Sequence, residues 1–148
     1  MSSGAMGNGC MFCEIVAGRE PASVVYSDSC VLAFLDVAQI NTGHLLVVPR
    51  THAAGLADLD EAAGAAMFRA AQRLAAALRA SGLPCDGVKL MLSDGEAGGQ
   101  EVPHIHLHVL PRTCDDGYRV QVTSHSTTRA ELDEAASRIR ASLTAGAV

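Results

Sequence analysis

The spacing of apolar and polar positions decides which element each segment of the chain is expected to form. Short apolar or alternating runs predict strands at residues 24–26, 31–36, 44–49 and 87–92. The first two runs flank a polar turn at 27–29 and therefore predict a hairpin. The third run is almost wholly apolar, which is typical of a strand buried on both faces.

Other segments have the spacing of helices. Residues 10–16 predict a short helical turn, and between 59 and 78 apolar residues recur every three or four positions. Asp58 and Glu61 form a potential capping box before that longer helix. A second capping box at 128–131 predicts a C-terminal helix. Its inward face is expected to carry Leu132, Ala135, Ala136, Ile139 and Leu143.

The most informative stretch is residues 102–112, with the sequence VPHIHLHVLPR. Three histidines, His104, His106 and His108, occupy every second position and alternate with aliphatic residues. In a strand such alternation puts the imidazoles on one face and the aliphatic side chains on the other. At ~3.3 Å per residue the outer two histidines would be ~13 Å apart at the backbone. We therefore expect the three histidines to have different roles.

The order of these elements predicts the fold class. Several strands precede one long helix, and two further strands follow, joined by a glycine-rich loop at 93–100. This order indicates an α+β fold with a five-stranded, mainly antiparallel sheet, one long central helix and a C-terminal helix. We expect a flexible N-terminus at 1–9 and a single domain at 10–148, because no repeat or linker divides the chain.

Composition excludes several classes of function. The net charge of −5, without a basic cluster, disfavours long nucleic acid as a partner. We find no signal peptide and no apolar run near the ~20 residues of a membrane span, so we expect a cytoplasmic protein with reduced thiols and no membrane partner. In that setting the C-x-x-C pair of Cys10 and Cys13 indicates metal or redox chemistry.

A histidine strand beside a glycine-rich loop suggests chemistry at phosphorus. Neutral imidazole is a nucleophile near pH 7, and protonated imidazole donates hydrogen bonds to phosphate. Gly98, Gly99 and Gln100 directly precede the histidine strand, and glycines let backbone N–H groups approach an anion closely. The H-x-H-x-H spacing alone is also compatible with a metal site.

Together these segments resemble a known family. Residues 99–112, GQEVPHIHLHVLPR, are similar to the signature of the histidine triad (HIT) nucleotide hydrolases and transferases. Residues 10–18 (CMFCEIVAG) resemble the opening of the bacterial Hint-like branch, and 33–36 (AFLD) and 43–52 (GHLLVVPRTH) resemble its central strands. The resemblance covers about residues 10–118. It implies the HIT-like fold, usually paired as a homodimer.

The resemblance also implies an activity, that of a nucleoside phosphoramidase or related nucleotide hydrolase. His106 would attack the α-phosphorus of a purine nucleoside 5′-phosphoramidate or related nucleotide and form a nucleotidyl-histidine. Water would then release the nucleoside monophosphate. His108 would bind the α-phosphate and stabilise charge on its oxygens, and His44 would support the orientation of the nucleophile.

Nucleotide-binding positions follow from the same resemblance. Asp36 would hold the ribose hydroxyls, and its neighbours Val37 and Leu46 would contact the base. The loop before the triad would contact the phosphate and the leaving group. The nucleotide-binding set is therefore expected to be Phe34, Asp36, Val37, Leu46, Ser93, Gly99, Gln100, Glu101, His106 and His108.

Two positions depart from the family pattern. The family often has Asn where Ser93 begins the glycine-rich loop, and a hydroxyl replaces only one of two amide hydrogen bonds. Glu101 stands where the eukaryotic Hint branch has Ser. A carboxylate there could protonate a departing amine, but it also adds negative charge near an anionic substrate.

A metal site is expected beside the catalytic histidines. Cys10 and Cys13 supply two thiolates at zinc-ligand spacing, and His52 and His104 could complete a Cys2His2 set. The resemblance supports this set, because bacterial members with the C-x-x-C pair often bind a structural zinc. Four such ligands leave no open coordination position, so the zinc would be structural.

Other functions remain open at this stage. Sister branches of the family, which share the triad, hydrolyse dinucleoside polyphosphates or transfer nucleotidyl groups. A nucleotide-binding regulator with little turnover is a second alternative, to which Ser93 gives weight. A metalloenzyme with all three triad histidines on one metal is disfavoured, because it needs a further ligand and leaves Cys10 and Cys13 unexplained.

Overall fold

The computed structural model describes residues 9–143, so the expected flexibility of residues 1–8 lies outside the described part. The chain divides into two compact units, one ending at Gly117 and the other beginning at Tyr118. The single domain expected from the sequence stays a prediction.

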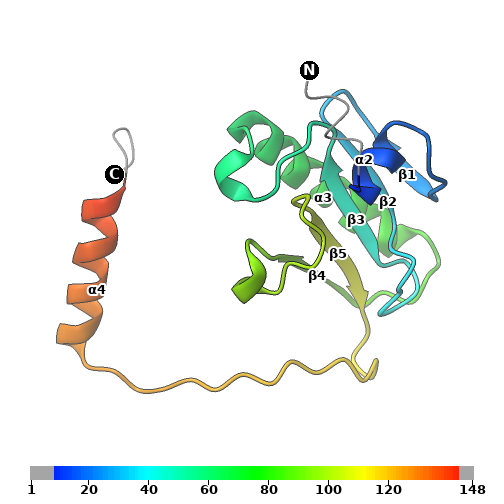
Figure 1. The fold of residues 1–148 in the computed structure, drawn as a ribbon. Coiled ribbons are helices and arrows are strands. Elements are labelled where there is room, and N and C mark those ends of the chain that lie inside the picture. The colour runs from blue at the N-terminus through cyan, green and yellow to red at the C-terminus, as the bar shows by residue number, and fades with distance from the viewer. Residues whose placement is uncertain (1–8, 144–148) are drawn as a thin grey trace. The chain divides into compact units, whose positions relative to one another are not determined.

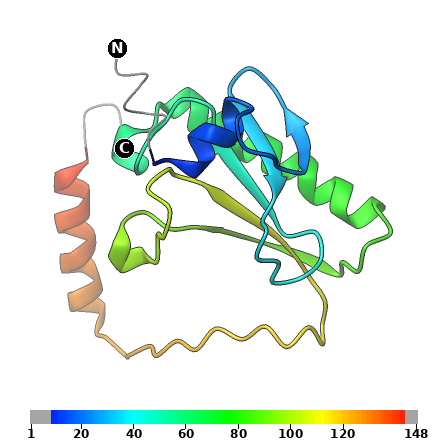
Figure 2. The same ribbon diagram turned by 45° about the vertical axis from the view of Figure 1, so that its right-hand side comes forward.

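The first unit is built on one five-stranded sheet (Figures 1 and 2). Its spatial order is β1-β2-β3-β5-β4, and every neighbouring pair is antiparallel. The strands are β1 (Val24–Ser27), β2 (Val31–Leu35), β3 (Leu45–Pro49), β4 (Gly87–Leu92) and β5 (Leu107–Arg112). The helices of this unit are α2 (Met11–Val16), α3 (Glu61–Ala80) and the short 3-10 helices η1 (Leu56–Asp58) and η2 (Glu96–Gly98).

Alternation along the central strands creates two apolar layers. One layer packs the sheet against α3, and its strand residues are Val31, Ala33, Leu45, Val47, Leu107 and Val109. The other layer packs the sheet against α2, and it contains Cys10, Phe12, Leu32, Phe34, Leu46 and Val48. His108 pairs with Leu46 across β5 and β3 and therefore lies on the α2 side. The functional groups thus gather on the sheet face that α3 leaves open.

β5 begins later than the sequence pattern predicts, at Leu107 rather than at residue 102. β4 ends at Leu92, the partner of Leu107, so no neighbouring strand extends the pairing on that edge. Upstream, Ile105 donates its N–H to the carbonyl of Ala53 at 2.7 Å instead. The expectation that all three histidines form one row on a strand face is therefore wrong, since only the last of them is in β5.

The central helix is present, but its predicted cap is wrong. α3 starts at Glu61 with Asp60 at the N-cap, and no side chain caps this end. Asp58 belongs to η1 instead. The periodic apolar pattern locates the body of a helix, whereas a short 3-10 turn before it is invisible to that pattern.

The second unit contains α4 (Arg129–Ser142) after an extended segment. Its predicted capping box is confirmed: Thr128 and Glu131 bond each other's backbone N–H groups reciprocally. The expectation of a buried inner face is wrong, because no residue of α4 is buried. The large apolar side chains that it exposes are Leu132 and Ile139, and Leu143 follows them at its end. Helical spacing predicts that these apolar side chains share one face of α4, but it does not identify what that face packs against.

No helix within residues 9–143 is both long and apolar enough to cross a lipid bilayer.

Candidate functional site

A cavity of about 1010 Å³ opens on the α2 side of the sheet. Its walls come from α2, the segment between α2 and β1, the ends of β2 and β3, and the loop that leads into β5. The sequence-predicted residues that line it are Phe34, Asp36, Val37, Leu46, Gly99, Glu101, His106 and His108. Its size is at the upper end of ordinary small-molecule sites.

His106 is buried in this site with a defined proton position. Its Nδ1 lies 2.8 Å from the backbone carbonyl oxygen of His104. A carbonyl oxygen only accepts hydrogen bonds, so Nδ1 carries the proton and donates it. In the neutral ring Nε2 is then left with its lone pair. The arrangement therefore supplies a nucleophilic nitrogen in a residue that lines the cavity.

His108 is linked to His44 through a second defined hydrogen bond. His44 Nδ1 accepts the N–H of Ile40 at 3.3 Å, so the proton of its neutral ring is on Nε2. That Nε2 lies 2.9 Å from Nδ1 of His108 and donates to it. Neutral His108 consequently carries its own proton on Nε2, where it serves as a hydrogen-bond donor.

Both of these histidines are held in the neutral form. Burial, reinforced by the neighbouring His106 and His44, lowers the pKa of His108 to about 4, although Asp36 opposes the shift. Burial also lowers the pKa of His44, again against the effect of Asp36, whose Oδ2 lies 3.7 Å from His44 Nε2. Near pH 7 the pair therefore acts through hydrogen bonding rather than through positive charge.

Gln39 holds the turn that carries His44, and the sequence analysis missed it. Its Oε1 accepts the N–H groups of Gly43 at 2.7 Å and His44 at 3.2 Å. Its Nε2 donates to the carbonyls of Asp36 and His44. The side-chain amide of Gln39 thus closes the β2–β3 turn and holds His44 in position to contact His108. No motif marks a glutamine for this role, since it depends on the shape of the turn.

Phe12 is the second residue that sequence reasoning missed. Its ring makes edge contacts with His104, His106 and Phe34, with centroid separations of 5.8, 5.2 and 5.6 Å. α2 therefore packs an aromatic ring against His106 as well as forming a wall of the cavity. The only sequence signal for this was its position between Cys10 and Cys13.

Gln100 holds the glycine-rich loop through its side chain. Its Oε1 accepts the N–H of Gly95 at 2.8 Å, and its Nε2 donates to the carbonyls of Ala54 and Val102 at 2.6 and 3.0 Å. Neither Gln100 nor Ser93 is among the residues that line the described cavity. Their expected contact with a nucleotide stays a prediction.

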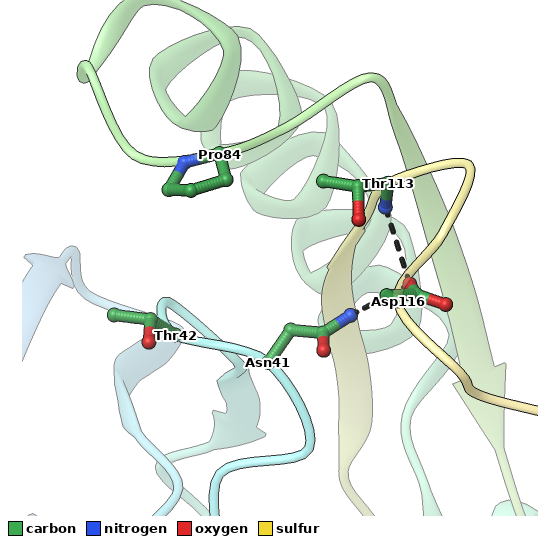
Figure 3. A pocket seen from close by; sticks show the side chains of 5 residues that line it. All are labelled: Asn41, Thr42, Pro84, Thr113 and Asp116. Atoms are coloured by element: carbon green, nitrogen blue, oxygen red, sulfur yellow. Dashed lines mark hydrogen bonds between the residues drawn. The ribbon is translucent and has the colours of Figure 1, made fainter.

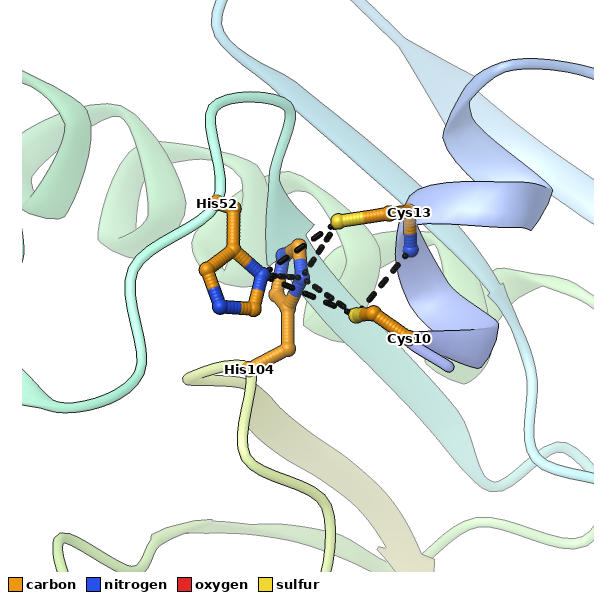
Figure 4. Close-up of side chains that lie close together, drawn as sticks. All are labelled: Cys10, Cys13, His52 and His104. Atoms are coloured by element: carbon orange, nitrogen blue, oxygen red, sulfur yellow. Dashed lines mark hydrogen bonds between the residues drawn. The ribbon is translucent and has the colours of Figure 1, made fainter. Parts of the chain in front are cut away.

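The four expected metal ligands converge at the other end of the histidine segment (Figure 4). The sulfur atoms of Cys10 and Cys13 lie 3.3 to 3.6 Å from Nδ1 of His52 and of His104. The two Nδ1 atoms are 3.2 Å apart. Zinc bonds of ~2.3 Å to sulfur and ~2.0 Å to nitrogen give tetrahedral edges of roughly 3.5 Å for S–N and 3.3 Å for N–N. The donor atoms therefore have the spacing of a closed zinc site.

The chemistry of these four ligand atoms, like their spacing, suits a bound cation. His104 Nε2 lies 2.9 Å from the carbonyl oxygen of Pro49 and donates to it, which leaves the lone pair of Nδ1 facing the sulfur atoms. Burial and the adjacent Cys10 raise the pKa of the Cys13 thiol to about 11. Two thiolates this close need a positive charge to stabilise them.

The structure separates the triad histidines into two clusters. His104 belongs to the cysteine cluster, whereas His108 groups with Asp36 and His44, and ligand atoms in each group lie within 4.8 Å of one another. Within residues 9–143 no such group contains all three triad histidines. This division contradicts a single metal held by the whole triad.

A smaller pocket of about 260 Å³ lies elsewhere, lined by Asn41, Thr42, Pro84, Thr113 and Asp116 (Figure 3). Its carboxylate is already engaged: Asp116 accepts from Asn41 Nδ2 at 2.8 Å and from the N–H of Thr113 at 3.1 Å, and it pairs with Arg112. These bonds tie the β2–β3 turn to the chain after β5. The network has a structural explanation that needs no ligand.

The fold and the site define a class: an α+β protein that combines two histidines with defined hydrogen bonds in one cavity with a Cys/His cluster that has metal-binding geometry. A family model described as the HIT domain matches residues 17–115. The chain therefore belongs to the HIT domain family. The resemblance inferred from the sequence is confirmed, as is the α+β antiparallel fold.

Three relatives illustrate the match. A HIT family protein from Bacillus anthracis is 35% identical, with a TM-score of 0.86 over 93% of this chain and 99% of that one. A Zn-bound histidine triad family protein from Mycobacterium smegmatis is 37% identical, with a TM-score of 0.73 over 91% of this chain and 98% of that one. Adenylylsulfatase HINT3 from Arabidopsis thaliana is 32% identical over 113 residues, which are 76% of this chain and 56% of that protein.

Proposed function

We propose that this protein is a nucleotide hydrolase that cleaves purine nucleoside 5′-phosphoramidates through a covalent nucleotidyl-histidine on His106. The observation that carries the proposal is the hydrogen bond from His106 Nδ1 to the carbonyl of His104. In the neutral ring this bond puts the proton on Nδ1, so that Nε2 keeps its lone pair in a residue of the cavity wall. That is the protonation state in which imidazole attacks phosphorus.

The proposed reaction has two steps. His106 Nε2 attacks the α-phosphorus, the new N–P bond forms, and the bond from phosphorus to the leaving amine breaks as the amine takes up a proton. Water then cleaves the N–P bond, which releases the nucleoside monophosphate and restores His106. The Nε2–H of neutral His108 would donate to the α-phosphate oxygens, on which negative charge develops in both steps.

The cavity suits the remaining parts of such a nucleotide. Phe34 and Leu46 provide apolar surface for a base, and Val37 lies at the exposed rim. Asp36 uses Oδ1 to accept the N–H of Ala38 at 2.9 Å, so Oδ2 can accept from a ribose hydroxyl. Gly99 can bring backbone close to the phosphate.

We also propose that Cys10, Cys13, His52 and His104 hold a structural zinc ion. The tetrahedral spacing of their donor atoms supports this, and the Mycobacterium smegmatis relative is described as Zn-bound. Bound zinc would stabilise the thiolates and join α2 to the segment before β5. A protein with such thiols suits a reducing compartment, which supports the expected cytoplasmic location.

Cleavage of an adenylyl–sulfate bond is a second candidate. It is favoured by the identity shared with the Arabidopsis protein named an adenylylsulfatase. The same nucleophile would serve, with a different leaving group. Dinucleoside polyphosphate hydrolysis and nucleotidyl transfer also use an attack at the α-phosphorus, so His106 is common to all these reactions.

The test replaces the nucleophile. We expect His106→Gly to abolish AMP release from adenosine 5′-phosphoramidate, while calorimetry still detects AMP binding. The matched control is His125→Gly, because His125 is exposed in the extended segment before α4. Wild-type turnover in the His106→Gly variant would refute the nucleophile assignment. Tight AMP binding without turnover in the wild type would instead favour a nucleotide-binding regulator.

A further inference from the structure

The cavity that would bind a nucleotide has an unusual charge balance. Its lining contains three carboxylates, from Glu20, Asp36 and Glu101, but no lysine or arginine. The two histidines in the lining are His106 and His108, and the lowered pKa of His108 keeps that ring neutral at pH 7. An anionic substrate would therefore be held by hydrogen-bond donors, without a fixed positive charge to offset further negative charge on it.

The three carboxylates differ in their bonding. Asp36 accepts a backbone N–H and lies next to His44. Glu101 is exposed, and its carboxylate makes no hydrogen bond or ion pair with the described residues 9–143. The backbone at Glu101 is nonetheless held in place, because the side chain of the preceding Gln100 donates hydrogen bonds to the carbonyls of Ala54 and Val102. A tethered loop therefore places in the cavity lining an acidic residue whose carboxylate is unpaired within residues 9–143.

The location of Glu101 points to the leaving group rather than to the nucleoside. The apolar wall comes from α2, β2 and β3, and Asp36 follows β2. Gly99 and Glu101 instead belong to the segment that runs into His106. If the base lies on the apolar wall and the α-phosphorus lies at His106, the wall that contains Gly99 and Glu101 faces the leaving group.

We propose that Glu101 selects the leaving group by charge, so that nucleoside 5′-phosphoramidates of cationic amines are preferred over those with anionic leaving groups. This inference rests on the proposed function and narrows its substrate class. Leaving groups that carry sulfate, phosphate or carboxylate would approach the unpaired carboxylate and be repelled. An amine with a second, protonated nitrogen would be attracted to it.

The expected size of this selection follows from simple electrostatics. Glu101 is exposed, so the dielectric between the charges lies between that of water and that of a protein surface. We expect roughly a tenfold change in kcat/KM for each unit of leaving-group charge at low ionic strength. Salt should reduce this preference, because exposed charges are screened over about 10 Å at 0.1 M ionic strength.

The test uses three adenosine 5′-phosphoramidates of similar length, made from putrescine, pentylamine and δ-aminovalerate. Their free ends are cationic, neutral and anionic. In the wild type we expect kcat/KM to fall in that order. Glu101→Gln should reduce the cationic-to-anionic ratio by about a hundredfold, because the two free ends differ by two units of charge. Glu96→Gln is the matched control, since it removes a carboxylate from the same loop outside the cavity lining.

Several results would overturn the inference. The wild type could process the three substrates at equal rates, or Glu101→Gln could keep the wild-type ratio. A loss of the ratio in Glu20→Gln instead would assign the selection to the other exposed carboxylate of the lining. Each of these outcomes leaves AMP release by the wild type intact, so the proposed function would survive.

Failure of the proposed function gives a different pattern, in which the wild type releases AMP from none of the three compounds. The charge selection is then tested through binding of the same compounds to wild type and Glu101→Gln by calorimetry. Tighter binding of the cationic compound that depends on Glu101 would support the inference. Equal affinities for all three would overturn it.

Discussion

At the scale of single residues, His104 connects the two halves of the site. Its Nδ1 faces the cysteine sulfurs, its Nε2 donates to Pro49, and its backbone carbonyl accepts from Nδ1 of His106. One residue thus belongs to the metal-binding geometry and also sets the proton position of the proposed nucleophile. The different roles expected for His104 and His106 rest on these bonds.

The sequence could identify the reactive residue types but not their proton positions. The H-x-H-x-H spacing and the family resemblance indicated His106 and His108. Which nitrogen carries the proton depends on carbonyls and N–H groups that only the folded backbone brings near. For the same reason Gln39 and Phe12 escaped notice, because their roles arise from turn geometry and helix packing.

A pH prediction belongs to His108. Its pKa falls from an ordinary 6.5 to about 4 on folding, so between these values the unfolded chain binds the proton and the folded chain does not. The stability contributed by the neutral ring is therefore fully present above pH 6.5 and is lost as the pH falls toward 4. Between these pH values the free energy of unfolding should fall in the wild type, and we expect it to fall by about 1 kcal/mol less in His108→Asn. This difference is discounted for solvent screening of the half-buried ring.

Chemical denaturation at a series of pH values measures this difference. His125→Asn is the control, because its ring is exposed and should leave the wild-type pH dependence unchanged. Parallel pH profiles for wild type and His108→Asn would contradict the burial of a neutral His108.

At the scale of elements, α2 joins the metal cluster to the cavity. It lies beside Cys10, contains Cys13, and packs Phe12 against His106. The run of residues 10–16 predicted the short helix, and the C-x-x-C pair indicated metal or redox chemistry at its start. The start of β5 was not predictable from alternation alone, because the alternating pattern continues upstream of Leu107 although β4 has ended and no strand pairs there.

A metal-removal prediction follows for this element. We expect close to one zinc per chain in freshly purified protein, and we expect His52→Ala to lose it. The free energy of unfolding of the variant should be lower by at least about 2 kcal/mol, because the buried thiol of Cys10, the half-buried thiol of Cys13 and the ring of His104 lose their common partner. AMP should also bind more weakly, since α2 forms part of the cavity wall.

Elemental analysis, denaturation and calorimetry test these three effects, with His125→Ala as the matched control. A zinc content near zero in the wild type would refute the zinc site. Wild-type metal content in His52→Ala would remove His52 from the ligand set.

At the scale of the whole molecule, strand and helix patterns were sufficient to predict the α+β class and its five-stranded sheet. They were insufficient for α4, because an apolar stripe does not say what covers it. Leu132 and Ile139 are exposed, and Val120 and Val122 of the preceding segment are exposed as well. The expected homodimer offers one way to cover such side chains, and it stays a prediction.

Sedimentation equilibrium tests the dimer. We expect a mass of about twice the 15.3 kDa of one chain at micromolar concentrations. Replacing Leu132 and Ile139 together by Ser should shift the distribution toward the single-chain mass if α4 contributes to the interface. A single-chain mass for the wild type at all concentrations would contradict the dimer.

The most direct test of the central claim is to trap the covalent intermediate. Wild-type protein mixed with adenosine 5′-phosphoramidate is quenched at alkaline pH within one turnover, digested and analysed by mass spectrometry. We predict one adenylyl group on the peptide that contains residues 104–108, with fragmentation assigning it to His106, and no adduct in His106→Gly. An adduct on another residue, or single-turnover AMP release at full rate without any adduct, would contradict the account.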